Sequence, residues 1–190
     1  MARTRTFIAV EISEPVRQRA AALQQKLART TPGVKWVEEA NLHITLLFLG
    51  EVDNLDLVPI CRIVKQQAAK LPPFTFEVSG LGVFPSVRRP KVLWAGIRDG
   101  GDELKTLHEN LEGPLLELGS YRREERAFSP HLTLGRLDSE VREGAWTPIL
   151  TEHEEWTAGF SQVTQILVMS SDLRRAGPTY NVVGRAPLED

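Results

Sequence analysis

The sequence has a single cysteine, Cys61, among its 190 residues. A lone cysteine cannot form a disulfide within the chain, which excludes the disulfide-rich secreted domains and fits the reducing cytoplasm, where we expect the protein to work. Cys61 lies in an apolar helical pattern, and a cysteine buried in a helix is usually unreactive. We therefore do not interpret it as a nucleophile.

Long hydrophobic runs are also absent. No apolar segment approaches the roughly 20 residues that span a bilayer. The basic residues near the N-terminus are followed by a short apolar stretch that Glu11 interrupts, so we expect no signal peptide and no membrane partner. The charges nearly cancel, with 23 Lys and Arg against 25 Asp and Glu. Binding of nucleic acid would therefore depend on local basic clusters rather than on net charge.

Strands and helices alternate along the chain in an order that repeats. Ser13 with Pro15 is typical of a helix start, Asp53-Asn54 can cap a second helix, and Gly100-Gly101-Asp102 opens a third helix that Gly119 closes. The predicted helices cover 13–30, about 55–70 and 101–118. The predicted strands cover 6–11, 34–37, 42–49 (ended by Gly50), 74–78, 92–97, 131–136, one or two within 160–170, and 179–185. The repeat indicates two related lobes, each with a small antiparallel sheet and covering helices, and a cleft between them.

The most informative feature is a short motif that occurs twice. Residues 41–50 read NLHITLLFLG and residues 129–138 read SPHLTLGRLD, so that His-x-Thr-Leu recurs 88 positions further on. Side chains alternate faces along a strand, so His43 and Thr45 point one way, as do His131 and Thr133, while the apolar residues between them point the other way. A duplicated core has no need to keep buried polar pairs, which are costly unless satisfied. The repetition therefore predicts one site that both strands line.

The remaining histidines and two aromatic residues have simpler interpretations. A single histidine on an apolar strand is more often a satisfied core residue than a catalyst. His108 has the spacing of a helix surface, and we expect His153, in an acidic His-Glu-Glu segment, to be solvated. Phe48 and Trp94 are interpreted as core residues. No His-x-His or His-Glu-x-x-His pattern occurs and no Asp cluster lies near either strand, so we expect no metal site and no cofactor.

Two histidines and two hydroxyls suit phosphodiester chemistry. Imidazole titrates near neutral pH, so a neutral and a protonated histidine can act as general base and general acid on opposite sides of one centre. Threonine hydroxyls, with the help of a cation, can donate hydrogen bonds to phosphate oxygens as charge shifts in the transition state. The near symmetry of the two motifs leaves open which histidine has which role.

These segments resemble the paired motifs of the 2H phosphoesterase superfamily, and in particular the bacterial and archaeal RNA 2′,3′-cyclic phosphodiesterases, historically called 2′-5′ RNA ligases. The likeness covers nearly the whole chain and includes RTFIAVE (5–11), KWVEEANLHITLLFLGEV (35–52), FPSVRRPKVLWAGI (84–97), FSPHLTLGR (128–136) and GPTY (177–180). It implies one domain over 1–190, an α+β fold of two interleaved pseudo-symmetric lobes, antiparallel sheets with helices on the outside and a central cleft. It also implies metal-independent hydrolysis of a terminal 2′,3′-cyclic phosphate on RNA to a 2′-phosphate. The reverse reaction would join RNA ends, such as tRNA halves, through a 2′-5′ linkage.

The resemblance also assigns roles. It makes His43 the proton donor and His131 the proton acceptor, and we expect Thr45 and Thr133 to hold phosphate oxygens. A basic residue of the family corresponds to Arg136. Its odd spacing from His131 turns it away from the site on an ideal strand, but a bulge at the intervening glycine could turn it back.

RNA beyond the cyclic phosphate needs cations and stacking surfaces. We expect contacts from two aromatic residues and one basic loop: Trp36, Tyr180, Arg88, Arg89 and Lys91. Further basic clusters lie at 122–126 and 174–175. Two alternatives stay open, namely the same histidine pair acting on a small cyclic phosphate, such as a cyclic nucleotide or an ADP-ribose derivative, and a non-catalytic binder of RNA ends. We expect a monomer.

Overall fold

The computed structural model describes residues 2–137, 144–174 and 177–189. Its strands are β1 (Arg3–Glu11), β2 (Val34–Trp36), β3 (His43–Asp53), β4 (Phe74–Phe84), β5 (Val92–Ile97), β6 (Leu132–Leu137), β7 (Thr157–Val163), β8 (Gln165–Arg174) and β9 (Gly177–Pro187). Its helices are α1 (Glu14–Ala28), α2 (Leu57–Ala68), α3 (Gly101–Leu118) and α4 (Thr147–Glu152), with short 3-10 helices η1 (Glu39–Asn41) and η2 (Asn54–Asp56). No helix among these residues is both long and apolar enough to cross a membrane.

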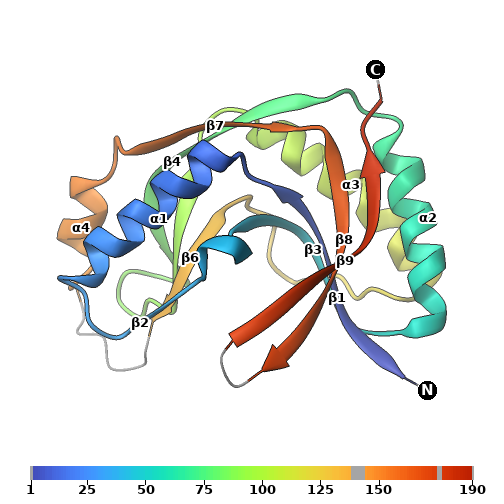
Figure 1. The fold of residues 1–190 in the computed structure, drawn as a ribbon, viewed down its shortest axis with the longest axis horizontal. Coiled ribbons are helices and arrows are strands. Elements are labelled where there is room, and N and C mark those ends of the chain that lie inside the picture. Colours follow the sequence, from blue (N-terminus) through green and yellow to red (C-terminus); the bar gives the residue numbers. More distant parts are fainter. Residues whose placement is uncertain (1, 138–143, 175–176, 190) are drawn as a thin grey trace.

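The strands form one curled antiparallel sheet with the two motif strands at its centre. Its order is β7-β4-β5-β6-β3-β1-β8-β9, with β2 paired to β6, so the two motif strands β3 and β6 are neighbours at the centre. They meet at a single paired position, Ile44 opposite Leu132. The chain order strand–helix–strand gives β1-α1-β3 on one side and β5-α3-β6 on the other (Figure 1). The predicted α+β class with a duplicated antiparallel arrangement is confirmed.

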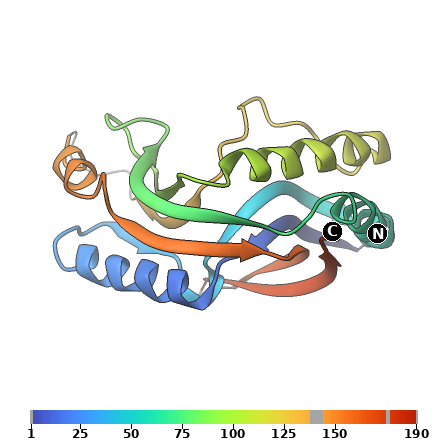
Figure 2. The same cartoon turned by 90° about the horizontal axis from the view of Figure 1, so that it is seen from above.

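The helices lie outside the sheet and bury its apolar face. Figure 2 shows α1 and α3 on opposite sides of the strands. Helix α1 packs against β7, α2 against β8 and β9, and α3 against α2 and β3. Helix α3 illustrates why: its leucines at 104, 107, 111 and 115 follow the spacing of one helical face, and all four are fully buried. This packing fixes β3, and with it the first motif, against the core.

Several predicted boundaries hold and others do not. Strand β5 and helix α3 have the predicted bounds, with Gly119 as the C-cap of α3. The prediction that Gly50 ends the motif strand was wrong: β3 continues to Asp53, and Gly50 adopts a φ of +74° beside a register shift opposite Thr6 and Phe7. Glycine tolerates this left-handed conformation, so the strand bends there instead of stopping.

Other local details also differ from the predictions. Strand β4 is longer than the predicted 74–78, and α4 was not predicted. The second helix begins later than residue 55, because η2 precedes it and the Asp53 carboxylate accepts a hydrogen bond from the N–H of Leu55 at 3.0 Å. Ser13 does stand at the N-cap of α1, but its side chain forms no cap; its hydroxyl donates instead to the carbonyl of Phe160 in β7 at 3.0 Å.

Candidate active site

The centre of the sheet brings the two motifs together. Ile44 pairs with Leu132 in antiparallel register. Because side chains alternate faces along a strand, the residues on either side of this pair, namely His43 and Thr45 on one strand and His131 and Thr133 on the other, point to the opposite face from it. The buried Ile44 and Leu132 occupy the other face. The four polar side chains thus share one face of the sheet, as the alternation of strand residues predicts.

Each motif strand contains an extra residue at the same place. Thr45 pairs with Ala9 and Leu47 with Ile8, so Leu46 is left over in β3. Thr133 pairs with Trp94 and Gly135 with Leu93, so Leu134 is left over in β6. A bulge of this kind reverses the alternation of the residues that follow it.

The two bulges turn a further residue of each motif toward the site. Phe48 and Arg136, each five positions past its histidine, line the same pocket as His43 and Thr133. Gly135 is needed beside the second bulge, since a Cβ there would lie 2.6 Å from Cγ1 of Val34 in the adjoining strand β2. The bulge predicted at this glycine therefore exists, and it points Arg136 into the pocket.

Main-chain carbonyls orient both imidazoles. Nδ1 of His43 donates to the carbonyl of Asn41 at 2.7 Å, and Nδ1 of His131 donates to the carbonyl of Ser129 at 2.7 Å. With the proton of each neutral ring on Nδ1, Nε2 is left as the reactive nitrogen. Nε2 of His43 accepts from the Thr45 hydroxyl at 2.9 Å, whereas no such bond joins His131 to Thr133 in the part of the chain that the structure describes.

Both histidines are electrostatically set to be neutral. Burial lowers the pKa of His43 below its usual value; the charges of Arg17 and His131 lower it further, and the bond to Asn41 opposes them. Burial also lowers the pKa of His131, against the opposing effect of the bond to Ser129. An anion bound between them would raise both pKa values.

Aromatic rings flank each histidine in a matched way. Phe7 stacks on His43 with ring centroids 5.0 Å apart, and Tyr180 meets the same imidazole edge-on at 5.4 Å. On the other side Phe84 meets His131 edge-on at 5.0 Å, with Trp94 at 6.3 Å. These contacts limit the rotation of both imidazoles, and Phe7 and Tyr180 also form part of the pocket wall.

The pocket has a volume of about 520 Å³ and a basic lining. It lies between the segment 35–41 and the β8–β9 hairpin, with the motif strands as its floor. Arg5, Lys35 and Arg136 contribute cations, and Glu38 is the one acidic residue among its lining side chains. His131 itself is not part of this lining, although Thr133 beside it is. The arrangement can accept an anion next to an acid–base pair.

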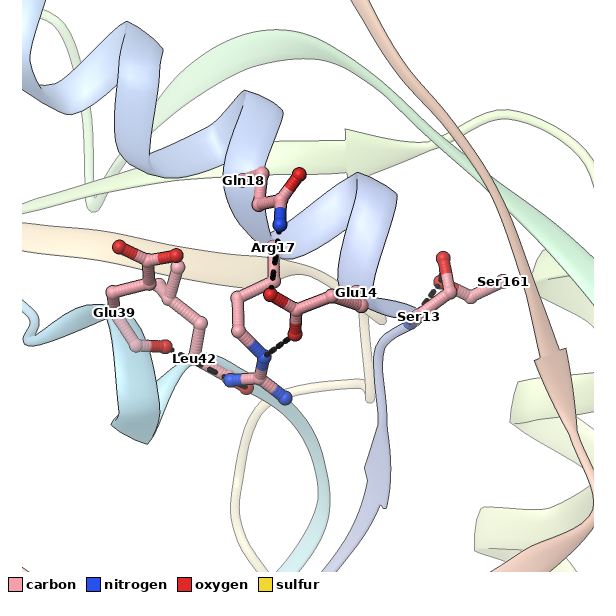
Figure 3. Close-up of polar contacts among 7 residues, drawn as sticks. All are labelled: Ser13, Glu14, Arg17, Gln18, Glu39, Leu42 and Ser161. Atoms are coloured by element: carbon pink, nitrogen blue, oxygen red, sulfur yellow. Dashed lines mark hydrogen bonds and ion pairs between the residues drawn. The ribbon is translucent and has the colours of Figure 1, made fainter.

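Arg17 connects helix α1 to the segment that leads into His43. Its guanidinium donates to the carbonyl of Glu39 at 2.8 Å and to that of Leu42 at 3.2 Å, and Nε lies 3.5 Å from the Glu14 carboxylate (Figure 3). Figure 3 also shows the start of α1 held to β7, where the N–H of Ser13 donates to Oγ of Ser161 at 2.8 Å. The residue before His43 is thus fixed from the helix side.

The structure separates the residues predicted to contact RNA. Trp36 and Tyr180 line the pocket. The basic loop residues Arg88, Arg89 and Lys91 are exposed and do not line it. Arg175 and the side chain of Arg174 lie outside the described residues.

Three interpretations of individual residues were wrong. Phe48 is not a core residue: it is 38% exposed, because the bulge at Leu46 turns it to the pocket. His153 is buried rather than solvated, since it closes α4 and its Nδ1 donates to the carbonyl of Ile149 at 2.8 Å. His108 is half-buried, stacks on Phe128 at 4.2 Å and donates to the carbonyl of Leu46 at 2.8 Å.

Some pocket residues were missed from the sequence. Arg5, Lys35 and Asn41 line the pocket, and Arg17 supports it from behind. Alternation along β1 could have identified Arg5, since Phe7 two positions later faces His43. Within residues 2–137, 144–174 and 177–189, no three His, Cys, Asp or Glu side chains gather as metal ligands would.

Comparison with known proteins gives one consistent group of relatives. A family model described as LigT-like phosphoesterase matches residues 10–94. A Thermotoga maritima protein named RNA 2′,3′-cyclic phosphodiesterase is 34% identical over 185 residues, covering 97% of this chain and 96% of its own. An Aeropyrum pernix protein of the same name is 34% identical and covers 87% of this chain and 92% of its own. None of the relatives compared bears a name that supports the alternative of a small cyclic phosphate.

Solved structures agree on the fold. The crystal structure of TT0787 from Thermus thermophilus has a TM-score of 0.83 with this chain at 27% identity, covering 97% of both chains. That of E. coli LigT complexed with 3′-AMP has a TM-score of 0.77 at 24% identity, covering 99% of both. At that identity the second likeness concerns the fold alone.

Proposed function

The chain belongs to the LigT-like phosphoesterase family, and we propose that it hydrolyses the terminal 2′,3′-cyclic phosphate of RNA to a 2′-phosphomonoester. Relatives spanning nearly the whole chain carry the name RNA 2′,3′-cyclic phosphodiesterase. The observation that carries the proposal is the central pairing of Ile44 with Leu132, which brings the two His-x-Thr segments together on one face of the sheet. Two imidazoles and two hydroxyls on one face can act on a single phosphorus atom.

In the proposed reaction His43 is the acid and His131 the base. The bond from His131 to Ser129 is exposed, whereas that from His43 to Asn41 is partly buried. Nε2 of His131 also has no threonine bond within the described residues, so it can accept the proton of an attacking water. His43, more deeply enclosed and bonded to Thr45, would give its proton to the departing 3′ oxygen once the bound phosphate has raised its pKa. Breaking the bond between phosphorus and the 3′ oxygen leaves the phosphate on the 2′ oxygen.

The remaining pocket residues have separate tasks in this proposal. Thr45, Thr133 and Arg136 hold the non-bridging phosphate oxygens, and Arg136 balances the charge that grows there in the transition state. Phe48, which is exposed in the same pocket, offers its ring to the terminal base, as do Trp36 and Tyr180 in neighbouring positions. The loop residues Arg88, Arg89 and Lys91 would touch only RNA that extends beyond the pocket.

The wider context of the reaction is part of the same proposal. Residues 1–190 would form one domain of two interleaved lobes, each supplying one His-x-Thr strand, and act as a monomer in the cytoplasm. The chemistry needs no metal ion or cofactor, because the histidines move both protons and Arg136 stabilises the anion. Run in reverse, it would join RNA ends such as tRNA halves through a 2′-5′ bond.

A defined oligonucleotide tests the proposal. RNA ending in a 2′,3′-cyclic phosphate is incubated with the protein in excess EDTA, and the product is identified by chromatography against 2′- and 3′-phosphate standards. We expect a 2′-phosphate, and loss of general acid or base should lower kcat by about 10²–10⁴-fold in His43→Gln and in His131→Gln. Arg3→Ala, a charge change on β1 outside the pocket, is the control and should retain activity.

Each other outcome has a definite meaning. A 3′-phosphate product would refute the roles given to the two histidines. Activity that EDTA abolishes and a divalent metal restores would refute the metal-independent mechanism. Binding of the RNA end without turnover would leave a non-catalytic binder as the correct description.

A further inference from the structure

Arg5 is a pocket residue for which the proposed reaction has no use. It lies on β1, is half-buried, and lines the same pocket as His43 and Arg136. Its guanidinium carbon stands 4.8 Å from the centre of the Phe48 ring. A cation over an aromatic face is favourable, but one face of a ring does not satisfy the five N–H donors of a guanidinium.

No carboxylate neutralises this cation within the described residues. The ion pairs there involve Arg17, Lys26, Arg98, Lys105, His108, Arg123 and His153, and none includes Arg5, Lys35 or Arg136. Glu51, opposite Arg5 in the β1–β3 register, is exposed and makes no ion pair with it. Among the described residues, Arg5 is therefore a half-buried cation without an acidic partner, and its guanidinium can bind an anion that enters the pocket.

Arg5 faces the same space as Arg136. Burial raises the pKa of Tyr180, and the charges of Arg136 and Arg5 both act to lower it, so the phenol lies within the field of both cations. Arg136 belongs to the strand of His131, however, and Arg5 to the strand beside His43. The two cations thus approach the pocket from different sides.

The position of Arg5 along β1 determines the distance between its side chain and the histidines that would act on the phosphate. Phe7 stacks on His43, and Arg5 is two residues earlier on the same face of the strand, about 7 Å further from that histidine. One sugar–phosphate unit can bridge such a step. With the cyclic phosphate at the histidines and the terminal base on Phe48, the next phosphate of the strand comes beside the guanidinium that covers that ring.

We propose that Arg5 binds the phosphodiester linking the terminal nucleotide to the one before it. This subsite rests on the proposed function and deepens it, because it explains how the pocket tells an RNA end from a mononucleotide. A guanidinium suits the task, since its parallel N–H groups match two phosphate oxygens. The group recognised is an internucleotide phosphate, independent of base sequence.

A neutral linkage tests the subsite without changing the protein. Two dinucleotides ending in a 2′,3′-cyclic phosphate are compared, one with a normal internucleotide phosphate and one with an uncharged methylphosphonate there. Wild-type protein should lose about tenfold in kcat/KM on the methylphosphonate, since the uncharged linkage takes away the charged oxygens that the guanidinium would bind. Arg5→Ala should show the same rate on both dinucleotides.

Further measurements separate this role from mere support of Phe48. Arg5→Ala should change kcat/KM on the mononucleoside 2′,3′-cyclic phosphate little, and should reduce the slope of log kcat/KM against log salt on RNA by about 0.7. Arg3→Ala, two residues along the same strand and outside the pocket, is the matched control. Equal losses for Arg5→Ala on mononucleotide and dinucleotide, or equal wild-type rates on the two linkages, would overturn the subsite. Wild-type protein inactive on every cyclic phosphate would instead overturn the proposed function.

Discussion

Replacing Arg17 with alanine should both loosen the entry to β3 and change the titration of His43. The substitution removes hydrogen bonds at 2.8 and 3.2 Å to the carbonyls of Glu39 and Leu42 (Figure 3). The side chain is 18% exposed and its partner Glu14 65% exposed, so the ion pair adds little and the carbonyl bonds dominate. We expect a loss of about 2 kcal/mol in the free energy of unfolding, which for a chain of this size lowers Tm by about 4–8 °C.

The same variant should raise the pKa of His43, because the positive charge of Arg17 contributes to holding it down. Thermal unfolding measures the first effect, and an NMR titration of the His43 ring measures the second. Arg17→Lys is the matched control, since it keeps the charge and loses the fork of donors; stability should fall while the pKa of His43 stays low. An alanine variant with an unchanged Tm, or with an unchanged His43 pKa, would show that the contacts in Figure 3 do not position this histidine.

Three further predictions concern the pocket. Burial lowers the pKa of both histidines, so kcat/KM should depend on pH as a bell with its maximum below pH 6.5, the usual histidine pKa. The bound phosphate should shift the alkaline limb of the kcat profile to higher pH than that of the kcat/KM profile. Alkaline limbs that coincide in the two profiles would argue against an anion beside His43. Phe48→Ala should lower kcat/KM on RNA about tenfold, as expected for the loss of base stacking. On an RNA whose terminal nucleotide has no base, the wild type and Phe48→Ala should have the same kcat/KM. Asn41→Ala keeps the main-chain carbonyl that orients His43 but removes the hydrogen bond from the side-chain amide to the carbonyl of Pro178 at 3.1 Å. KM should rise about fivefold with kcat little changed, and amide hydrogen exchange in the β8–β9 hairpin should become faster. Unchanged exchange would show that this hydrogen bond does not hold the hairpin.

The motifs could be found from the sequence because their signal is local. Period-two alternation and the identity of two residue types define His43 and Thr45, and again His131 and Thr133. Helix α3 was predictable for a similar reason, since Gly119 supplies the left-handed C-cap that its end requires.

The bulges were the main obstacle to reading the site. On an unbroken strand Phe48 falls on the face of Ile44, which is buried, so an unbroken alternation assigns it to the core. The extra residue at Leu46 moves Phe48 to the other face. A leucine within an apolar run does not indicate a bulge, so the sequence could not predict this one. Only Gly135 hinted at the equivalent bulge near Arg136. His153 was misjudged for another reason: its acidic neighbours suggest a solvated segment, but the folded chain brings it against α1, where Lys26 Nζ lies 3.5 Å from Nε2.

The two bulges also bear on a question that the paired motifs leave open. A perfectly two-fold site would accept a phosphodiester in either direction, and neither histidine would be the acid by necessity. The position five residues past each histidine breaks that symmetry, with an aromatic ring on the His43 side and a guanidinium on the His131 side. If the terminal base stacks on Phe48 as proposed above, its ribose, and hence the departing 3′ oxygen, would lie nearest β3 and His43. Attack in line with that departure would then come from the opposite side, next to His131, in keeping with the proposal that His43 is the proton donor and His131 the base.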